Sequence, residues 1–368
     1  MKEPITYVGI DAHARELHLA MLRWDESSPT EWTLPNEPRA IERLRRRLER
    51  DAPGPIECCY EAGPTGYTLQ RRLTAGRVQC RVIAPSLIPQ KTGDRIKTDR
   101  RDARKLAQLL RADLLTTIQP PSEDAEAVRD IIRARDDARV DLMRSRHRLS
   151  KLLLRRGHVY PGTPWTKQYW TEWLPQLHWP HAAERHVVRD YELAIRHVAG
   201  RLDELDRAIA EIALTPPYDA PVAALRCFRG IDTLIAMTLL AELYDLRRFP
   251  HPRALMAFVG LVPSEHSSGD RQSRGRLTRT GNTLVRRMLI QAAWQYNRPP
   301  SLNAALQQRR AGQPAAVLAI AMKAEQRLCH RYLRLCARQK SKPLVIAAVA
   351  RELVGFIWAM MQLPMTRG

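Results

Sequence analysis

TYVGIDAHARELHLAML, residues 6–22, is the stretch that decides the fold of the first part of this chain. Its apolar residues form two runs, 6–11 and 17–22, and the short polar turn between them predicts a β-hairpin. A third strand is expected over residues 30–34. The same patterns then predict a helix at 40–50, a strand at 56–61, a helix at 65–75, a strand at 78–85 and a helix at 99–112. Strands that alternate with helices after a hairpin predict a mixed sheet with helices on its faces.

Two acidic residues stand where predicted strands end. Asp11 closes the run TYVGID, and Glu61 closes IECCYE (56–61). Ligands of open α/β sheets bind beyond the carboxyl ends of the strands. We therefore expect Asp11 and Glu61 to face a ligand site.

Two further carboxylates belong to a predicted helix in IKTDRRDARKLAQLLRA (96–112). Asp99 and Asp102 are three residues apart, so they share one face of that helix. Leu106 and Leu109 continue the same stripe. We expect both aspartates to point where the leucines point, toward the sheet.

These four carboxylates indicate a metal site. Burial of a carboxylate is costly unless a cation neutralises it. Mg²⁺ prefers hard oxygen ligands, and two such ions about 4 Å apart hold a phosphodiester between them. The pattern predicts that Asp11, Glu61, Asp99 and Asp102 bind Mg²⁺ for chemistry on nucleic acid.

The charge of the chain agrees with such a substrate. Sixty Lys and Arg residues stand against 39 Asp and Glu, which gives a formal net charge of +21. This excess favours a polyanionic partner, nucleic acid rather than a membrane surface. An arginine-rich proteome is the alternative explanation.

The cysteines and the apolar segments indicate a reduced, soluble protein. The six cysteines lack a paired spacing and are expected in the core: Cys58, Cys59, Cys80, Cys227, Cys329 and Cys336. We find no signal peptide, and we expect no apolar run long enough to span a membrane. The expected location is the cytoplasm.

Proline pairs divide the chain. Pro120-Pro121 ends the first predicted domain, residues 1–119. Residues 120–215 predict two long charged helices, a helical hairpin or coiled-coil arm of a kind often used for self-association. The segment between them carries four tryptophans, which either pack at the tip of the arm or stack on bases: Trp165, Trp170, Trp173 and Trp179.

Residues 216–368 form the third predicted domain, which is helical. Its expected helices are 223–245, 252–259, 280–297, 313–338 and 343–361, with a polar loop at 263–282. The expected fold class is thus α/β followed by all-α.

The motifs GIDAH, YEAGPTGY and KTDRRDA resemble the DEDD transposases of bacterial insertion sequences, a family that includes the Piv DNA invertase and the bridge-RNA-guided recombinases. FRGIDTLIAMTLLAEL and FVGLVPSEHSSGDRQSRGRLTRTGNTLVRR are similar to the C-terminal transposase domain of that family. The resemblance implies a RuvC-like, ribonuclease-H-like first domain. It also implies that Asp11, Glu61, Asp99 and Asp102 are the catalytic tetrad.

The resemblance further implies a nucleophilic serine immediately before a glycine, here Ser268. Ser267 and Ser273 are close enough in sequence to be alternatives. Four arginines of the same loop are expected to contact phosphates: Arg271, Arg274, Arg276 and Arg279. Taken alone, the loop is more typical of a Ser/Gly-rich surface turn that only contacts phosphates, and it is the family resemblance that favours a nucleophile.

The partners implied by the resemblance are donor and target DNA, a structured guide RNA, and further copies of the chain in a homodimer or homotetramer with composite active sites. Two other functions stay open. One is a metal-dependent nuclease of the junction-resolvase kind, which cuts by water attack. The other is a non-catalytic nucleic-acid scaffold, although all four tetrad acids are present.

The segment FRGIDTLIAMTLLAEL also resembles a helix-hairpin-helix, in which a glycine turn presents backbone amides to phosphate. The family pattern Gly-Ile-Gly is here Gly230-Ile231-Asp232. The aspartate weakens the phosphate-binding interpretation and favours a packing role.

Overall fold

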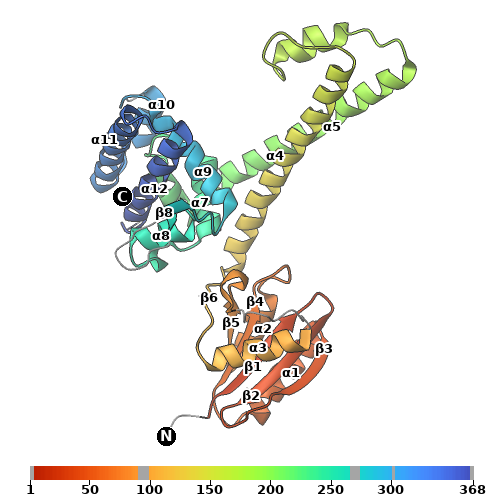
Figure 1. Cartoon of the computed structure of the whole chain (residues 1–368), viewed down its shortest axis with the longest axis vertical. Coiled ribbons are helices and arrows are strands. Elements are labelled where there is room, and N and C mark those ends of the chain that lie inside the picture. The colour runs from red at the N-terminus through yellow and green to blue at the C-terminus, as the bar shows by residue number, and fades with distance from the viewer. Residues whose placement is uncertain (1–3, 90–98, 266–273, 301–302, 365–368) are drawn as a thin grey trace. The chain divides into compact units, whose positions relative to one another are not determined.

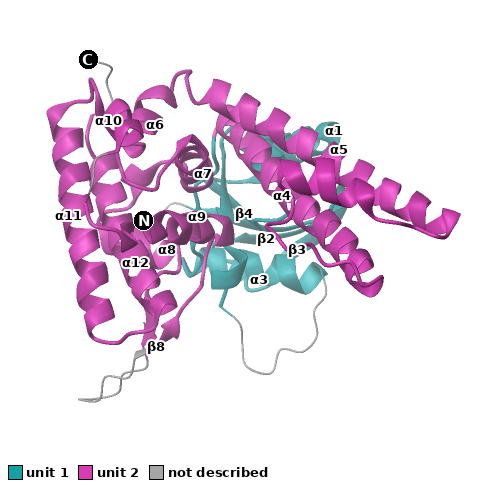
Figure 2. Cartoon of the chain, turned by 90° about the horizontal axis from the view of Figure 1, so that it is seen from above, with its two compact units in different colours: residues 1–121 teal, residues 122–368 magenta. Residues whose placement is uncertain are grey.

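A computed structural model of the chain describes residues 4–89, 99–265, 274–300 and 303–364. The chain divides into two compact units, residues 1–121 and 122–368, which are coloured separately in Figure 2. The further division of the second unit into an arm and a C-terminal domain stays a prediction.

Unit 1 is built on a mixed sheet, as expected (Figure 1). Its strands are β1 (Thr6–Ala12), β2 (Glu16–Arg23), β3 (Thr30–Pro35), β4 (Ile56–Glu61), β5 (Val78–Ile83) and β6 (Thr117–Ile118). They lie in the order β3-β2-β1-β4-β5-β6. The β1–β2 and β2–β3 pairs are antiparallel, whereas β4 runs parallel to both β1 and β5.

Helices cover both faces of this sheet. On one face, α1 (Pro38–Asp51) and α2 (Thr68–Thr74) bury Leu44 and Leu73 against Val8 and Ile10. The other face carries α3 (Asp99–Arg111), whose Ala103 and Ala107 pack on Ala20 and Leu22 of β2. A 3₁₀ turn, η1 (Pro85–Leu87), follows β5.

The close approach of α3 to β1 requires a glycine. A Cβ built on Gly9 would lie 2.1 Å from the carbonyl oxygen of Ala103 and 2.4 Å from the nitrogen of Ala107. Both contacts are with backbone, which a rotamer change does not relieve. Gly9 therefore sets how deeply α3 sits on the sheet.

The arm at the start of unit 2 consists of α4 (Glu123–Arg155) and α5 (Ala182–Ile212). Ser122 caps α4 by accepting a hydrogen bond from the Ala125 N–H at 3.2 Å. Between the helices, a π-helical turn (Tyr169–Trp173) and a 3₁₀ turn (Leu174–Gln176) form the tip.

The tryptophans of the tip pack against one another and against the arm. Tyr169 is buried, with its ring centroid 5.1 Å from that of Trp165 and 5.2 Å from that of Trp173. Leu149 and Leu153 of α4 belong to the same cluster. The packing interpretation of this segment is confirmed.

The remainder of unit 2 is mostly helical. Its elements are α6 (Asp219–Leu225), α7 (Thr233–Leu243), η4 (Leu246–Arg248), α8 (Pro252–Phe258), β7 (Pro263–Glu265), β8 (Arg274–Leu277), α9 (Thr283–Ala293), η5 (Trp294–Asn297), α10 (Ala304–Arg310), α11 (Ala315–Ala337) and α12 (Lys342–Met361). The helix expected over 223–245 is broken between α6 and α7, where Gly230 adopts a φ of +83°. The antiparallel β7–β8 pair was not expected from the sequence.

One expectation about apolar segments is wrong. Among the described residues, α12 is long and apolar enough to cross a membrane by length and composition. Half of that segment is buried inside the structure, and Val349 and Leu353 belong to the core of unit 2. The core helix of a soluble protein satisfies the same criteria.

Candidate metal centre

A row of polar residues crosses the sheet of unit 1 at one level. Asp11 of β1 is paired with His18 of β2, and His18 is paired with Thr33 of β3. On the other side of β1, Ile10 is paired with Tyr60, so Glu61 comes next to Asp11 on the parallel strand β4. The row therefore reads Thr33, His18, Asp11, Glu61.

This row faces α3. Successive side chains of a strand point to opposite faces. Gly9, two residues before Asp11, faces the backbone of α3, and Cys59, two residues before Glu61, packs against Leu106 of α3. Asp11 and Glu61 therefore lie on the same face as Asp99 and Asp102.

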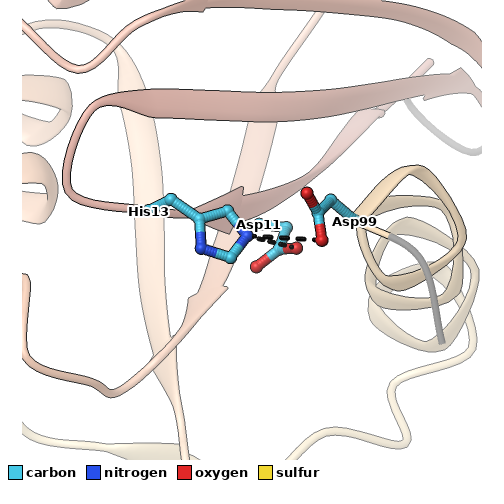
Figure 3. A group of neighbouring side chains, drawn as sticks. All are labelled: Asp11, His13 and Asp99. Carbon is cyan, nitrogen blue, oxygen red and sulfur yellow. Dashed lines mark hydrogen bonds and ion pairs between the residues drawn. The ribbon is translucent and has the colours of Figure 1, made fainter.

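Asp11 and Asp99 converge on one histidine nitrogen (Figure 3). His13 Nε2 donates to Asp11 Oδ2 at 3.2 Å and lies 3.5 Å from Asp99 Oδ1. Each of the three residues offers one atom that could ligate a metal ion, and these three atoms all lie within 4.8 Å of one another. Two carboxylates from different elements thus share one small volume.

Asp99 also contacts His18. Its Oδ2 lies 3.4 Å from His18 Nε2. Each carboxylate oxygen of Asp99 thus faces a different histidine, because Oδ1 faces His13.

Asp99 contacts residues of the sheet side, as its place on the leucine face predicts, but its side chain is 53% exposed, so the expected burial is wrong for this residue. The buried stripe of α3 consists of Ala103, Leu106, Ala107 and Leu110, and Leu109 is half-buried beside it. Asp99 is the first residue of α3 and contacts residues at the ends of β1 and β2, so solvent reaches its outer side. Asp102 is half-buried.

The electrostatics of the site favour a cation. Burial raises the pKa of the Asp11 carboxyl above its ordinary value, His13 opposes the rise, and the charges of Asp99 and Asp102 add to it. Carboxylates crowded in this way repel one another until positive charge is placed between them. The donor set of hard oxygens suits a divalent ion such as Mg²⁺.

Two models of known protein families match the chain. A DEDD transposase model of the IS110 type matches residues 8–156, and the model described as "Transposase IS116/IS110/IS902 family" matches residues 222–307. A putative transposase of Sinorhizobium fredii is 41% identical over 322 residues, which cover 87% of this chain and 78% of that protein.

The transposase for insertion sequence element IS1533 of Leptospira borgpetersenii is 36% identical over 342 residues, which cover 91% of this chain and 97% of that protein. The chain belongs to the IS110/IS116 family of DEDD transposases. Membership implies cleavage and rejoining of DNA with the help of a divalent metal ion, and the acidic cluster of unit 1 fits that requirement.

The second expected site of this transposase lies largely outside the described residues. Ser267, Ser268, Ser273 and Arg271 fall in that segment, and the side chain of Arg274 is not described. The strands on either side of the segment, β7 and β8, pair with each other. Arg276 and Arg279 are exposed.

The turn at Gly230 carries a packing role in this transposase. A Cβ on Gly230 would lie 2.5 Å from the carbonyl oxygen of Ala292. Asp232 caps α7, because its Oδ1 accepts a hydrogen bond from the Ile235 N–H at 2.8 Å. The Asp232 carboxylate thus occupies the Ile235 backbone N–H, at a helix start where a helix-hairpin-helix would present such groups to phosphate.

The sequence reasoning missed His13 and His18 as parts of the site. His13 stands inside the quoted motif GIDAH, and the alternation of β2 places His18 on the α3 side. The signal for His13 is its place two residues after Asp11, and the signal for His18 is its cross-strand pairing with Asp11, which depends on register.

Proposed function

We propose that this transposase cleaves and rejoins the DNA strands of a mobile element with a tetrad of Asp11, Glu61, Asp99 and Asp102 and with Ser268 as nucleophile. The observation that carries the tetrad is the convergence of Asp11 and Asp99 on one nitrogen, at 3.2 Å and 3.5 Å. The register places Glu61 beside Asp11, and the charge of Asp102 acts on Asp11.

The carboxylates would hold Mg²⁺, which would stabilise the charge that develops on phosphate oxygens. Asp11, on a strand anchored in the sheet, supplies a fixed oxygen, and Asp99 supplies a second one from the start of α3. The exposed side of Asp99 leaves the cluster open toward a large substrate such as DNA.

Ser268 supplies the covalent step. Its Oγ attacks phosphorus, and the bond from phosphorus to the leaving DNA oxygen breaks as the serine–phosphate bond forms. The hydroxyl of another strand then attacks the same phosphorus, the serine–phosphate bond breaks, and the phosphate is joined to the new strand while the serine hydroxyl is restored. The family match over residues 222–307 includes Ser268, and the exposed Arg276 and Arg279 near it suit phosphate contacts.

The partners in this proposal are donor DNA, target DNA and a structured guide RNA, bound by a homodimer or homotetramer in the cytoplasm. The net charge of +21 supports an extended contact with phosphate backbones. The two long helices of the arm suit self-association.

The test is a search for a protein–DNA adduct that survives denaturation. We expect wild-type protein with Mg²⁺ and substrate DNA to form it, Ser268→Ala to abolish it, and Ser267→Ala and Ser273→Ala to retain it. Broken DNA without an adduct in the wild type would indicate the nuclease alternative. An adduct that persists in Ser268→Ala would contradict the choice of serine.

A further inference from the structure

His18 is a histidine with a neighbour at each ring nitrogen. Its side chain is 18% exposed. Nε2 lies 3.4 Å from Asp99 Oδ2, and Nδ1 lies 3.2 Å from the hydroxyl oxygen of Thr33. Both neighbours belong to elements that pack against β2, because Thr33 is paired with His18 across the β2–β3 ladder and α3 covers this face.

The chemistry of the two neighbours selects one tautomer. An ionised carboxylate only accepts hydrogen bonds, so the nitrogen that faces Asp99 must carry the proton. In the neutral ring Nδ1 is then an acceptor, and the Thr33 hydroxyl is a donor that satisfies it. Thr33 thus hydrogen-bonds to one side of the His18 ring, and the protonated Nε2 on the other side faces Asp99 at ion-pair distance.

Asp99 needs such a contact more than Asp11 does. Asp11 lies within β1, where it is paired with His18 of β2 and directly follows Ile10, which is paired with Tyr60 of β4. Asp99 is the first residue of α3 and its side chain is half exposed, so several rotamers are open to it. An outer partner that fixes a ligating side chain strengthens metal binding, typically by 10- to 100-fold.

We propose that His18, oriented by Thr33, is a positioning residue that holds the Asp99 carboxylate in the conformation that binds the metal ion. The proposal rests on the proposed function, because it takes Asp99 as a metal ligand. It assigns no contact with metal or DNA to His18 or Thr33.

A simpler role in stability predicts something different. An ion pair with a half-exposed carboxylate contributes little to folding. Glu16, at 3.9 Å from His18 Nε2 and 62% exposed, is a weaker neighbour. If His18 served stability alone, its loss would shift the melting temperature and leave the metal affinity unchanged.

The test measures Mn²⁺ binding to the full chain without DNA, by the loss of the electron paramagnetic resonance signal of free Mn²⁺. We expect His18→Leu to weaken binding by about tenfold or more. His18→Gln keeps an amide N–H that reaches toward Asp99, so it should restore most of the affinity. Thr33→Val, at an exposed position, should weaken binding by a few-fold, and Thr33→Ser should not.

Glu31→Gln is the matched control. Glu31 of β3 pairs with Arg104 of α3 at 2.6 Å, so this variant removes the charge from another contact between the sheet and α3 and leaves Asp99 untouched. Its Mn²⁺ affinity should equal that of the wild type. Metal-free melting temperatures of all variants show whether each one folds.

The outcomes separate the two proposals. If Asp11→Asn and Asp99→Asn bind Mn²⁺ as the wild type does, the proposed metal site itself is wrong. If those two variants lose binding while His18→Leu and Thr33→Val stay within twofold of the wild type, the positioning role is overturned. Equal losses in His18→Leu and Glu31→Gln would also overturn it, because they would indicate general undocking of α3.

Discussion

At the scale of single residues, the ionised Asp11 carboxylate is expected to destabilise the fold when no metal ion is bound. Burial and neighbouring acids raise its pKa above 3.8, so its ionisation begins to destabilise the metal-free fold as the pH rises above 3.8 and does so fully above the folded pKa. We predict that Asp11→Asn raises the melting temperature at neutral pH in a chelator. The difference should vanish below pH 3.8, where the carboxyl is protonated in both states.

The same variant should lose the stabilisation that a divalent ion gives to the wild type. Glu16→Gln is the control, because Glu16 is an exposed acid of the neighbouring strand. A lower melting temperature of Asp11→Asn at neutral pH in chelator would contradict the interpretation that burial and crowding dominate at this residue.

Much of the site was predictable residue by residue. Apolar runs that end in acids placed Asp11 and Glu61 at strand ends, and period-3 spacing placed Asp99 and Asp102 on one helix face. The contacts of His18 were not predictable, because they depend on cross-strand register. Helix periodicity also does not show which end of a helix extends beyond the residues that pack on it. Asp99 is exposed because it is the first residue of α3.

At the scale of elements, the docking of α3 on β1 depends on Gly9. We predict that Gly9→Ala lowers the free energy of unfolding by about 1–3 kcal/mol, because the added Cβ meets helix backbone. Denaturant unfolding of the full chain measures the change. Mn²⁺ affinity should fall with it, since α3 carries Asp99.

Gly200→Ala is the matched control. Gly200 lies within α5, and a Cβ there meets nothing within 4 Å. The substitution should raise stability, by up to about 1 kcal/mol, because alanine is the better helix former. An unchanged free energy of unfolding in Gly9→Ala would contradict the tight approach of α3 to β1.

A second tie between elements joins α4 to α9. Asp136 accepts hydrogen bonds from Arg287 and from Arg139, the latter at 2.8 Å. Burial alone would raise the pKa of Asp136, but the two guanidinium groups outweigh it and lower the pKa.

We predict that Asp136→Asn lowers the free energy of unfolding by about 1.5–3 kcal/mol at neutral pH. A lowered acid pKa gives stability that is present above 3.8, the unfolded value, and is lost as the pH falls through the folded pKa. The difference between variant and wild type in urea unfolding should therefore shrink below pH 3.8. If the difference in stability between Asp136→Asn and the wild type did not change with pH, the proposed role of the Asp136 charge would be contradicted.

Element type followed from periodicity wherever elements were long. The two long helices predicted within residues 120–215 are α4 and α5. The strands β6 and β7, of two and three residues, are too short to show alternation. The partner of β6 is β5, far back along the chain, whereas β7 pairs with the next strand, β8.

At the scale of the whole molecule, the charge of +21 is the property that bears on partners. We predict that the purified protein carries one abundant structured RNA that is encoded beside its gene. Sequencing of the RNA that co-purifies with the protein measures this. Asp102→Asn should retain that RNA, because it removes a metal ligand and no basic group. A random sample of cellular RNA would contradict guidance by a specific molecule.

The central claim is that a divalent ion held by the tetrad drives DNA strand exchange by this transposase. The most direct measurement is recombination of donor and target DNA by the full chain across a Mg²⁺ titration, with Asp11→Asn, Asp99→Asn and Glu16→Gln in parallel. We predict metal-dependent recombination by the wild type and by Glu16→Gln, and losses of at least about 100-fold at saturating Mg²⁺ in the two tetrad variants. Recombination at the wild-type rate by Asp11→Asn or Asp99→Asn would contradict the account.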